Sequence, residues 1–318
     1  MGIIKGDYME DYGYGKAYGK VILIGEHSVV YHKPAIALPL KNLKVETYIT
    51  KSTEDITVDS IFYQGFLKDA PNLEGIKVLV LETHLFLNRK PEKIHIKIDS
   101  KVPEKRGLGS SAAVSVSVVR ALFNYYKEEL TLETLKKLAH QAEMIHHIDP
   151  SGLDAETVLS EEAIFFVKHK TIEKIEVNLN GILVVADTGV HGHTKDAVSN
   201  VKKLLVEDEM KVRNAMDQLE DLTQQAKTFI QTDELEKLGS IMTKAHHILD
   251  ELEISDQTLN DLVNLALKNQ ALGAKLTGGG KGGSMIALMR NMEEALKLKD
   301  VFHNYGLKNV WLHHLKGE

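Results

Sequence analysis

The segment that most constrains this chain is the glycine-serine turn at residues 107–113, because a different kind of segment lies on each side of it. Upstream, residues 93–99 alternate apolar and polar side chains, which predicts a half-buried strand. Downstream, residues 112–126 contain neither Gly nor Pro and predict a helix. A turn that opens a helix exposes unpaired backbone N–H groups at the positive end of the helix dipole. The segment therefore predicts an anion site, and the usual anion is a phosphate.

Two common phosphate-binding loops do not describe this turn. Residues 107–112 fit the G-x-G-x-x-G/A pattern of dinucleotide-binding folds, in which a strand runs directly into the glycines and an acidic residue ends the next strand. Here residues 100–106 intervene, and the acids at the expected distance, Glu128 and Glu129, lie between two predicted helices. The P-loop pattern also fails, since no Gly-Lys-Ser/Thr follows at the required spacing. A turn that only caps a helix remains the alternative.

The length of 318 residues exceeds what one core usually fills and suits two domains. A change to long helix-period segments near residue 180 predicts domains at residues 1–180 and 181–318. The class is α+β in both, with antiparallel sheet rather than serial βαβ units. We expect strands at residues 21–25, 44–50, 93–99, 163–167, 182–186, 285–289 and 310–313. We expect helices at residues 72–88, 112–126, 132–146, 201–230, 234–252, 257–270 and 292–305.

The composition limits which binding partners and which cellular compartment we expect. A net charge of −6 argues against a broad basic face, so we expect no nucleic-acid partner. The absence of cysteine excludes disulfides, zinc-thiolate sites and a thiol nucleophile, and it favours a cytoplasmic protein. No apolar run is long enough to span a membrane, and Met1–Gly19 lacks the apolar core of a signal peptide.

A second glycine loop stands at residues 278–283, immediately before the predicted strand at residues 285–289. All of its positions except Lys281 are glycine, which favours close approach of the backbone to a ligand. A flexible linker is the alternative, and the apolar strand that follows argues against it.

Charged residues flank the predicted strand at residues 21–25, with Lys20 at its start and Glu26 and His27 just after it. Such residues at the mouth of a buried strand are either site residues or part of a solvated turn. The paired histidines, such as His246 and His247, lack the i, i+4 spacing of metal ligands, and we assign them no function.

Two acidic residues further along have two interpretations each. Glu143 lies beside the apolar stripe of the helix at residues 132–146, where it is either solvated or a Mg²⁺ ligand. Asp154 follows a tight turn, where it is either the N-cap of a short helix or a general base at a substrate hydroxyl.

Taken together, residues 20–30, 103–113 and 275–283 resemble the three signature motifs of the GHMP kinases, in the same order. The family is named for galactokinase, homoserine kinase, mevalonate kinase and phosphomevalonate kinase. The resemblance is greatest to its bacterial mevalonate kinases, because residues 25–30, Gly-Glu-His-Ser-Val-Val, resemble their Gly-Glu-His-Ala-Val-Val. Glu143, His146 and Asp154 likewise resemble the segment that carries the magnesium Glu and the catalytic Asp.

This resemblance implies a two-domain GHMP kinase fold, with an N-terminal domain like the second domain of ribosomal protein S5 and a ferredoxin-like C-terminal domain. It implies ATP-dependent phosphorylation of the C5 hydroxyl of mevalonate to 5-phosphomevalonate, a step of isoprenoid biosynthesis. The implied ligands are ATP, Mg²⁺ and mevalonate. A cytoplasmic location and a homodimer are further expectations.

The resemblance also implies a role for each matching residue. Asp154 takes the hydroxyl proton and Lys20 stabilises the developing charge. Ser111 and Glu143 hold Mg²⁺. The ATP phosphates contact Pro103, Gly107, Leu108, Gly109, Ser110, Ser111, Ala112 and Ala113. Mevalonate contacts Glu26, His27 and Thr194, and the site is completed by Gly278, Gly279 and Gly280.

Two positions depart from the family pattern. Tyr18 stands where a Pro usually precedes Gly-Lys, and Arg106 stands where eukaryotic members have a small residue. Arg106 either adds a cation near phosphate or faces solvent, and with Lys105 it keeps a phosphomevalonate kinase as an alternative. A catalytically inactive nucleotide- and metabolite-binding sensor is the alternative from another class. It is disfavoured because Lys20, Glu143 and Asp154 are all present.

Overall fold

The computed structural model describes residues 12–146 and 152–316, so most of the turn before Asp154 lies outside the described residues. The chain forms two compact units that interleave along the sequence. Unit 1 comprises Met1–Gly19, Leu43–Val102 and Ser111–Leu159, and unit 2 comprises Lys20–Asn42, Pro103–Ser110 and Ser160–Glu318. The units interleave because two long strands, β1 (Tyr12–Ile24) and β2 (Ala35–Lys51), contribute residues to both. A domain boundary at residue 180 stays a prediction from composition.

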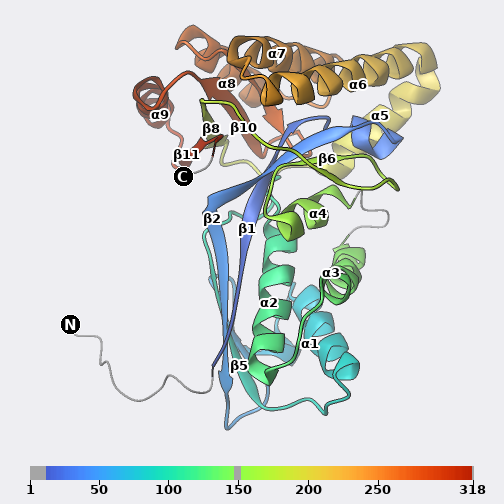
Figure 1. Ribbon diagram of the computed structural model, residues 1–318, viewed down its shortest axis with the longest axis vertical. Coiled ribbons are helices and arrows are strands. Elements are labelled where there is room, and N and C mark those ends of the chain that lie inside the picture. The colour runs from blue at the N-terminus through green and yellow to red at the C-terminus, as the bar shows by residue number, and fades with distance from the viewer. Residues whose placement is uncertain (1–11, 147–151, 317–318) are drawn as a thin grey trace. The chain divides into compact units, whose positions relative to one another are not determined.

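Unit 1 is built on a sheet with helices packed on it (Figure 1). The second half of β2 pairs antiparallel with β5 (Ile94–Ser100), which pairs in parallel with β3 (Thr57–Asp59). The short strand β4 (Gln64–Phe66) continues the sheet, and β1 pairs with β2. Its helices are α1 (Glu74–Phe86), α2 (Ser110–Tyr126), α3 (Leu132–His146) and α4 (Leu153–Ser160), with a 3₁₀ turn, η2 (Leu67–Asp69).

The first half of β1 was not among the predicted strands, because its Tyr- and Gly-rich sequence looked polar. The residues on the two faces of this strand explain why it forms. Gly13 and Gly15 face α2 so closely that a Cβ on either would collide with the helix backbone. Tyr14 on the other face packs against Tyr48 with tilted rings and donates a 2.8 Å hydrogen bond to Glu46. The strand thus alternates small residues against a helix with tyrosines away from it.

Unit 2 contains an antiparallel sheet in the order β11-β8-β10-β9. These strands are β8 (Ile182–Asp187), β9 (Gly273–Thr277), β10 (Ser284–Met289) and β11 (Val310–His314). The beginning of β2 pairs with β6 (Ile164–Phe166), which pairs with β7 (Glu173–Lys174), and a 3₁₀ turn, η1 (Ser28–Tyr31), follows β1. The helices are α5 (Thr194–Glu207), α6 (Glu209–Gln231), α7 (Leu235–Glu251), α8 (Gln257–Lys268) and α9 (Met292–Tyr305).

Most of the predicted elements are confirmed, and each unit combines helices with a mainly antiparallel sheet, as the predicted α+β class requires. The single helix predicted at residues 201–230 is wrong, since α5 and α6 are separate. Asp208 separates them, and its side chain accepts a 3.0 Å hydrogen bond from the N–H of Lys211. An Asp at this position caps the start of α6 and therefore ends the preceding helix.

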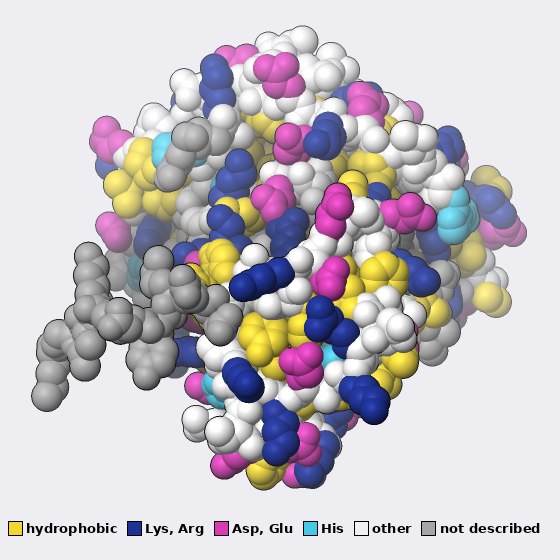
Figure 2. Space-filling view, turned by 60° about the horizontal axis from the view of Figure 1, so that its bottom comes forward, with side chains coloured by type: hydrophobic (Ala, Val, Ile, Leu, Met, Phe, Trp, Pro, Cys, Tyr) yellow, Lys and Arg dark blue, Asp and Glu magenta, His cyan; other side chains and the backbone are white. Residues whose placement is uncertain are grey.

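Charged side chains of both signs are interspersed on the face shown in Figure 2, with hydrophobic side chains between them. Among residues 12–146 and 152–316, no helix combines the length and the apolar character needed to cross a membrane.

Candidate functional site

The predicted phosphate loop is a tight turn that leads into α2, which begins at Ser110. Gly107 and Gly109 have φ of 76° and 72°, a left-handed conformation that favours glycine. The N–H of Lys20 donates a 2.9 Å hydrogen bond to the carbonyl of Leu108. A Cβ on Gly109 would lie 2.7 Å from Cγ of Lys20, so this glycine makes room for the lysine side chain. Residues 107–110 of the loop and Lys20 are therefore one local structure within unit 2.

The exposure of the loop residues agrees with a backbone cradle at a helix start. Ser111, in the first turn of α2, is exposed, and Leu108 and Gly109 are buried. Half-buried residues are Pro103, Gly107, Ser110 and Ala112, and Ala113 is buried.

The second glycine loop connects β9 to β10 and packs against the first. Gly278 has a φ of 79°, and a Cβ on it would lie 2.9 Å from Cα of Gly107. A Cβ on Gly107 would in turn lie 3.3 Å from Cα of Gly278. The backbones of the two loops touch only because both residues lack a side chain. A flexible linker is therefore excluded for residues 278–283.

His27, in the turn after β1, binds this second loop. Its Nε2 lies 3.0 Å from the carbonyl oxygen of Gly279. A carbonyl only accepts, so Nε2 carries the proton and Nδ1 keeps a lone pair. Burial lowers the pKa of His27 to about 4, although the bond to Gly279 opposes this. The imidazole is therefore neutral near pH 7 and can accept a hydrogen bond at Nδ1.

Thr194 also lies against this glycine. It is the first residue of α5 and is exposed. A Cβ on Gly279 would collide with Oγ1 of Thr194. The structure thus brings together three residues that were predicted to contact one substrate, namely His27, Thr194 and Gly279.

Glu26, by contrast, is buried in an ion pair. Its side chain is 1% exposed and that of Lys275 is 0% exposed. The Nζ of Lys275 binds Oε1 of Glu26 and also donates a 2.7 Å hydrogen bond to the carbonyl of Leu276. Burial lowers the pKa of Lys275, against the opposing effect of Glu26. Oε2 of Glu26 is buried without a hydrogen-bond partner in the described part of the chain.

This pair belongs to a set of contacts between the end of β1 and β9. Oγ1 of Thr277 donates a 2.9 Å hydrogen bond to the carbonyl of Ile22 and accepts one from its N–H at 3.1 Å. Sequence reasoning missed Lys275, although a lysine between apolar residues and three positions before a glycine loop is a signal that could have indicated it. The contact of Glu26 with mevalonate stays a prediction.

His246, one of the paired histidines, supports β9 from α7. Its Nδ1 accepts a 3.3 Å hydrogen bond from the N–H of Leu276, and its Nε2 lies 3.0 Å from Oδ1 of Asn260. Burial lowers the pKa of His246 to about 4, and Lys275 contributes to this. The contacts of this neutral, buried ring assign it a structural role.

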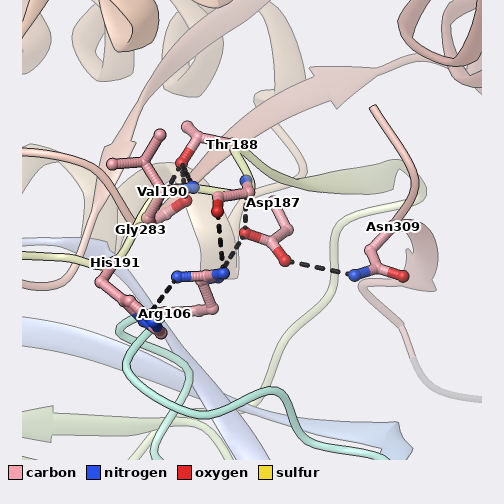
Figure 3. Close-up of polar contacts among 8 residues, drawn as sticks. Arg106, Asp187, Thr188, Val190, His191, Gly283 and Asn309 are labelled. Carbon is pink, nitrogen blue, oxygen red and sulfur yellow. Dashed lines mark hydrogen bonds and ion pairs between the residues drawn. The ribbon is translucent and has the colours of Figure 1, made fainter. Parts of the chain in front are cut away.

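The side chain of Arg106 is bound to other residues of the protein and does not extend into solvent. Figure 3 shows its guanidinium group turned toward Asp187 at the end of β8, with a 2.8 Å ion pair between Nε and Oδ1. The side chain of Arg106 is 13% exposed. Of the two alternatives for Arg106, the ion pair therefore excludes a side chain that only faces solvent.

Three of the predicted catalytic and metal-binding residues, Ser111, Glu143 and Asp154, lie in unit 1. Glu143 is half-buried on α3, and Ser111 lies on α2. Their carboxylate and hydroxyl oxygens are hard ligands of the kind that Mg²⁺ takes alongside phosphate oxygens. Asp154 is the second residue of α4, which begins at Leu153. The alternative that Asp154 is the N-cap is therefore wrong, because it lies inside the first turn. Within the described ranges, no cluster of three or more His, Cys, Asp or Glu could hold a metal ion.

Comparison with known proteins gives consistent matches along the chain. The GHMP kinases N terminal domain matches residues 76–160, and the GHMP kinases C terminal domain matches residues 226–307. A mevalonate kinase of Pyrococcus horikoshii is 33% identical over 314 residues, covering 92% of this chain and 93% of the relative.

Solved structures agree with these matches. The crystal structure of mevalonate kinase from methicillin-resistant Staphylococcus aureus is 32% identical, covers 96% of this chain and all of its own, and superposes with a TM-score of 0.74. The L. major mevalonate kinase in complex with R-mevalonate is 23% identical, with a TM-score of 0.82 and coverage of 98% and 99%. At that identity the second likeness shows the fold alone.

Proposed function

The chain belongs to the GHMP kinase family, and from that premise we propose that it is an ATP-dependent mevalonate kinase. The observation that carries the proposal is the 33% identity to a mevalonate kinase over 92% of the chain. The reaction forms a bond between the C5 oxygen of mevalonate and the γ-phosphorus of ATP, breaks the bond from that phosphorus to ADP, and releases the hydroxyl proton.

Each step has a residue suited to it. The N–H groups at residues 107–112 bind the phosphates at the start of α2, where the helix dipole favours negative charge. The carboxylate of Asp154 orients the C5 hydroxyl and takes its proton. Lys20, fixed beside Gly109, places a cation next to the phosphate loop and stabilises charge on the transferred group. Mg²⁺ bound by Ser111 and Glu143 would neutralise part of the phosphate charge.

The proposed contacts with mevalonate depend on the neutral state of His27. Its Nδ1 can accept a hydrogen bond from a hydroxyl of mevalonate, and the exposed hydroxyl of Thr194 can donate one to the carboxylate. A phosphomevalonate kinase would need cations for the substrate phosphate. Arg106, one of the two candidates, is already paired with Asp187. This pairing disfavours that alternative.

The substrate assignment is tested by ADP release with Mg-ATP and four acceptors: mevalonate, phosphomevalonate, galactose and homoserine. We expect release with mevalonate alone. Release with phosphomevalonate but not with mevalonate would establish the alternative. Nucleotide binding without release with any acceptor would support the inactive sensor.

We expect Glu143→Gln to raise the Mg²⁺ concentration needed for half-maximal rate by roughly tenfold or more, with little change in the KM for mevalonate. The amide keeps the shape of the side chain and removes the charge that attracts the cation. The initial rate is measured against Mg²⁺ at fixed ATP. Glu133→Gln, an exposed acid in the first turn of the same helix, is the matched control. An unchanged Mg²⁺ requirement in Glu143→Gln would make Glu143 an ordinary surface acid.

A further inference from the structure

The guanidinium group of Arg106 contacts three residues of unit 2 (Figure 3). Its Nε lies 2.8 Å from Oδ1 of Asp187 in an ion pair, but this contact does not have the geometry of a hydrogen bond. Besides the ion pair of Nε with Asp187, Nη2 donates a 3.0 Å hydrogen bond to the carbonyl of Gly189. Nη1 donates to Nδ1 of His191 at 2.9 Å. We call Arg106, Asp187, Gly189 and His191 the Arg106 cluster. Since Asp187 already balances its charge, this arginine is placed to hold protein rather than phosphate.

The partner of Arg106 is itself rigidly held. Asp187 is the last residue of β8, and its side chain is 3% exposed. Its Oδ1 accepts a 2.9 Å hydrogen bond from the N–H of Gly189, and its Oδ2 accepts one from Nδ2 of Asn309 at 3.2 Å. The cluster therefore fixes the segment before Gly107 to the end of the sheet.

Backbone hydrogen bonds around the cluster join three loops. The N–H of Gly192 donates to the carbonyl of Lys105 at 2.9 Å, linking residues 188–193 to the phosphate loop. The N–H of His193 donates to the carbonyl of Lys281 at 3.1 Å, linking them to the second glycine loop. Residues 188–193 then lead directly into Thr194. The arginine thus lies where the predicted phosphate contacts and the predicted mevalonate contacts are connected.

We propose that Arg106 is a positioning residue, which acts through Asp187, Gly189 and His191 to hold the backbone N–H groups of residues 107–112 ready for the ATP phosphates. The inference rests on the proposed function, because it assumes that ATP phosphates bind this turn. Gly107 and Gly109 leave the turn conformationally free, and a restraint on one side of it lowers the entropy lost on binding. Residues held in this way affect binding without touching the ligand.

The test measures the Kd of the ATP analogue AMPPNP with Mg²⁺ by calorimetry, together with the melting temperature. We expect Arg106→Met to raise the Kd roughly tenfold. The Kd of Arg106→Lys should lie between those of Arg106→Met and the parent protein, because a lysine can pair with Asp187 but cannot also reach Gly189 and His191. Lys105→Met is the matched control, since Lys105 is the exposed neighbour of the same charge. It should stay within about twofold of the parent protein.

Asp187→Asn separates positioning from direct contact with phosphate. If Arg106 acts through Asp187, Asp187→Asn also raises the Kd of AMPPNP. The double variant with Arg106→Met then has a Kd no higher than that of the single variant with the higher Kd. If Arg106 bound phosphate directly, Asp187→Asn would leave the Kd unchanged or lower it, and this would overturn the inference. An equal loss in Lys105→Met would also overturn it, because net charge alone would then explain the effect.

Two further outcomes separate this inference from the proposed function. No AMPPNP binding by the parent protein would contradict the proposed function itself. Normal binding by the parent and an unchanged Kd in Arg106→Met, even at a lower melting temperature, would contradict only the positioning role. Should Arg106→Met fail to fold, Arg106→Lys and Asp187→Asn decide the question by the same criteria.

Discussion

Replacing Asp154 with Asn is expected to lower turnover by roughly 10²–10⁴-fold, the usual range for loss of a general base. An amide cannot take the proton of the C5 hydroxyl, although it can still orient that group. The fold should persist because Asn is close to Asp in size and Asp154 lies in the first turn of α4 without being its N-cap. A loose transition state needs little early proton transfer, which would place the loss toward the lower end of the range.

Turnover is measured at saturating mevalonate and ATP, with the melting temperature as the control for folding. Glu156→Gln is the matched variant, since Glu156 is the other acid in the first turn of α4 and pairs with Lys136 at 2.8 Å. It should keep nearly full turnover. A normally folded Asp154→Asn protein with turnover near that of Glu156→Gln would overturn the catalytic assignment of Asp154.

Lys275→Met is expected to lower the free energy of unfolding by about 3–5 kcal/mol, the usual loss when one partner of a buried ion pair is removed. The loss arises because the carboxylate of Glu26 would remain buried without its cation, and its Oε2 already lacks a hydrogen-bond partner in the described structure. Adding Glu26→Gln should recover much of the loss, since the buried charge is then gone.

Urea denaturation of the three proteins measures this, provided that the slope of the unfolding free energy against urea stays constant. Lys297→Met serves as the control, because Lys297 pairs with Glu293 on the exposed face of α9 and its removal should hardly change the midpoint. Equal stability of Lys275→Met and Lys297→Met would show that the buried pair does not stabilise unit 2. If the double variant were less stable than Lys275→Met, the unpaired charge of Glu26 would not be the cause of the lost stability.

Local patterns in the sequence predict much of this fold. The strand at residues 93–99 and the helix at residues 132–146 have clear periodicities and appear as β5 and α3. Both glycine loops were predicted because positive φ angles and close backbone contacts leave few residue types other than glycine.

The two errors in the predicted secondary structure arise from a long-range contact and from a helix cap, neither of which changes the hydrophobic periodicity. The first half of β1 looks polar until α2 is known to lie against Gly13 and Gly15. The break between α5 and α6 depends on one cap, Asp208, within a continuous helical pattern.

The candidate site was predicted less completely than the fold. His27 and Thr194, two residues to which the family resemblance assigns a substrate contact, both lie against Gly279 in unit 2. Glu26 pairs with Lys275, and Arg106 pairs with Asp187. In both pairs the two residues lie far apart in the sequence, and no local pattern indicates the pairing. Pairings of this kind are created by the fold, so they become visible only in three dimensions.

The central claim is tested most directly by identifying the product formed from mevalonate and Mg-ATP. Phosphorus NMR of the reaction mixture distinguishes a phosphate on the primary C5 oxygen from one on the tertiary C3 oxygen, because only the former couples to two methylene protons. We predict one new phosphomonoester, coupled to the C5 methylene and formed in equal amount to ADP. ADP without a phosphorylated mevalonate, or a phosphate on C3, would contradict the proposed function.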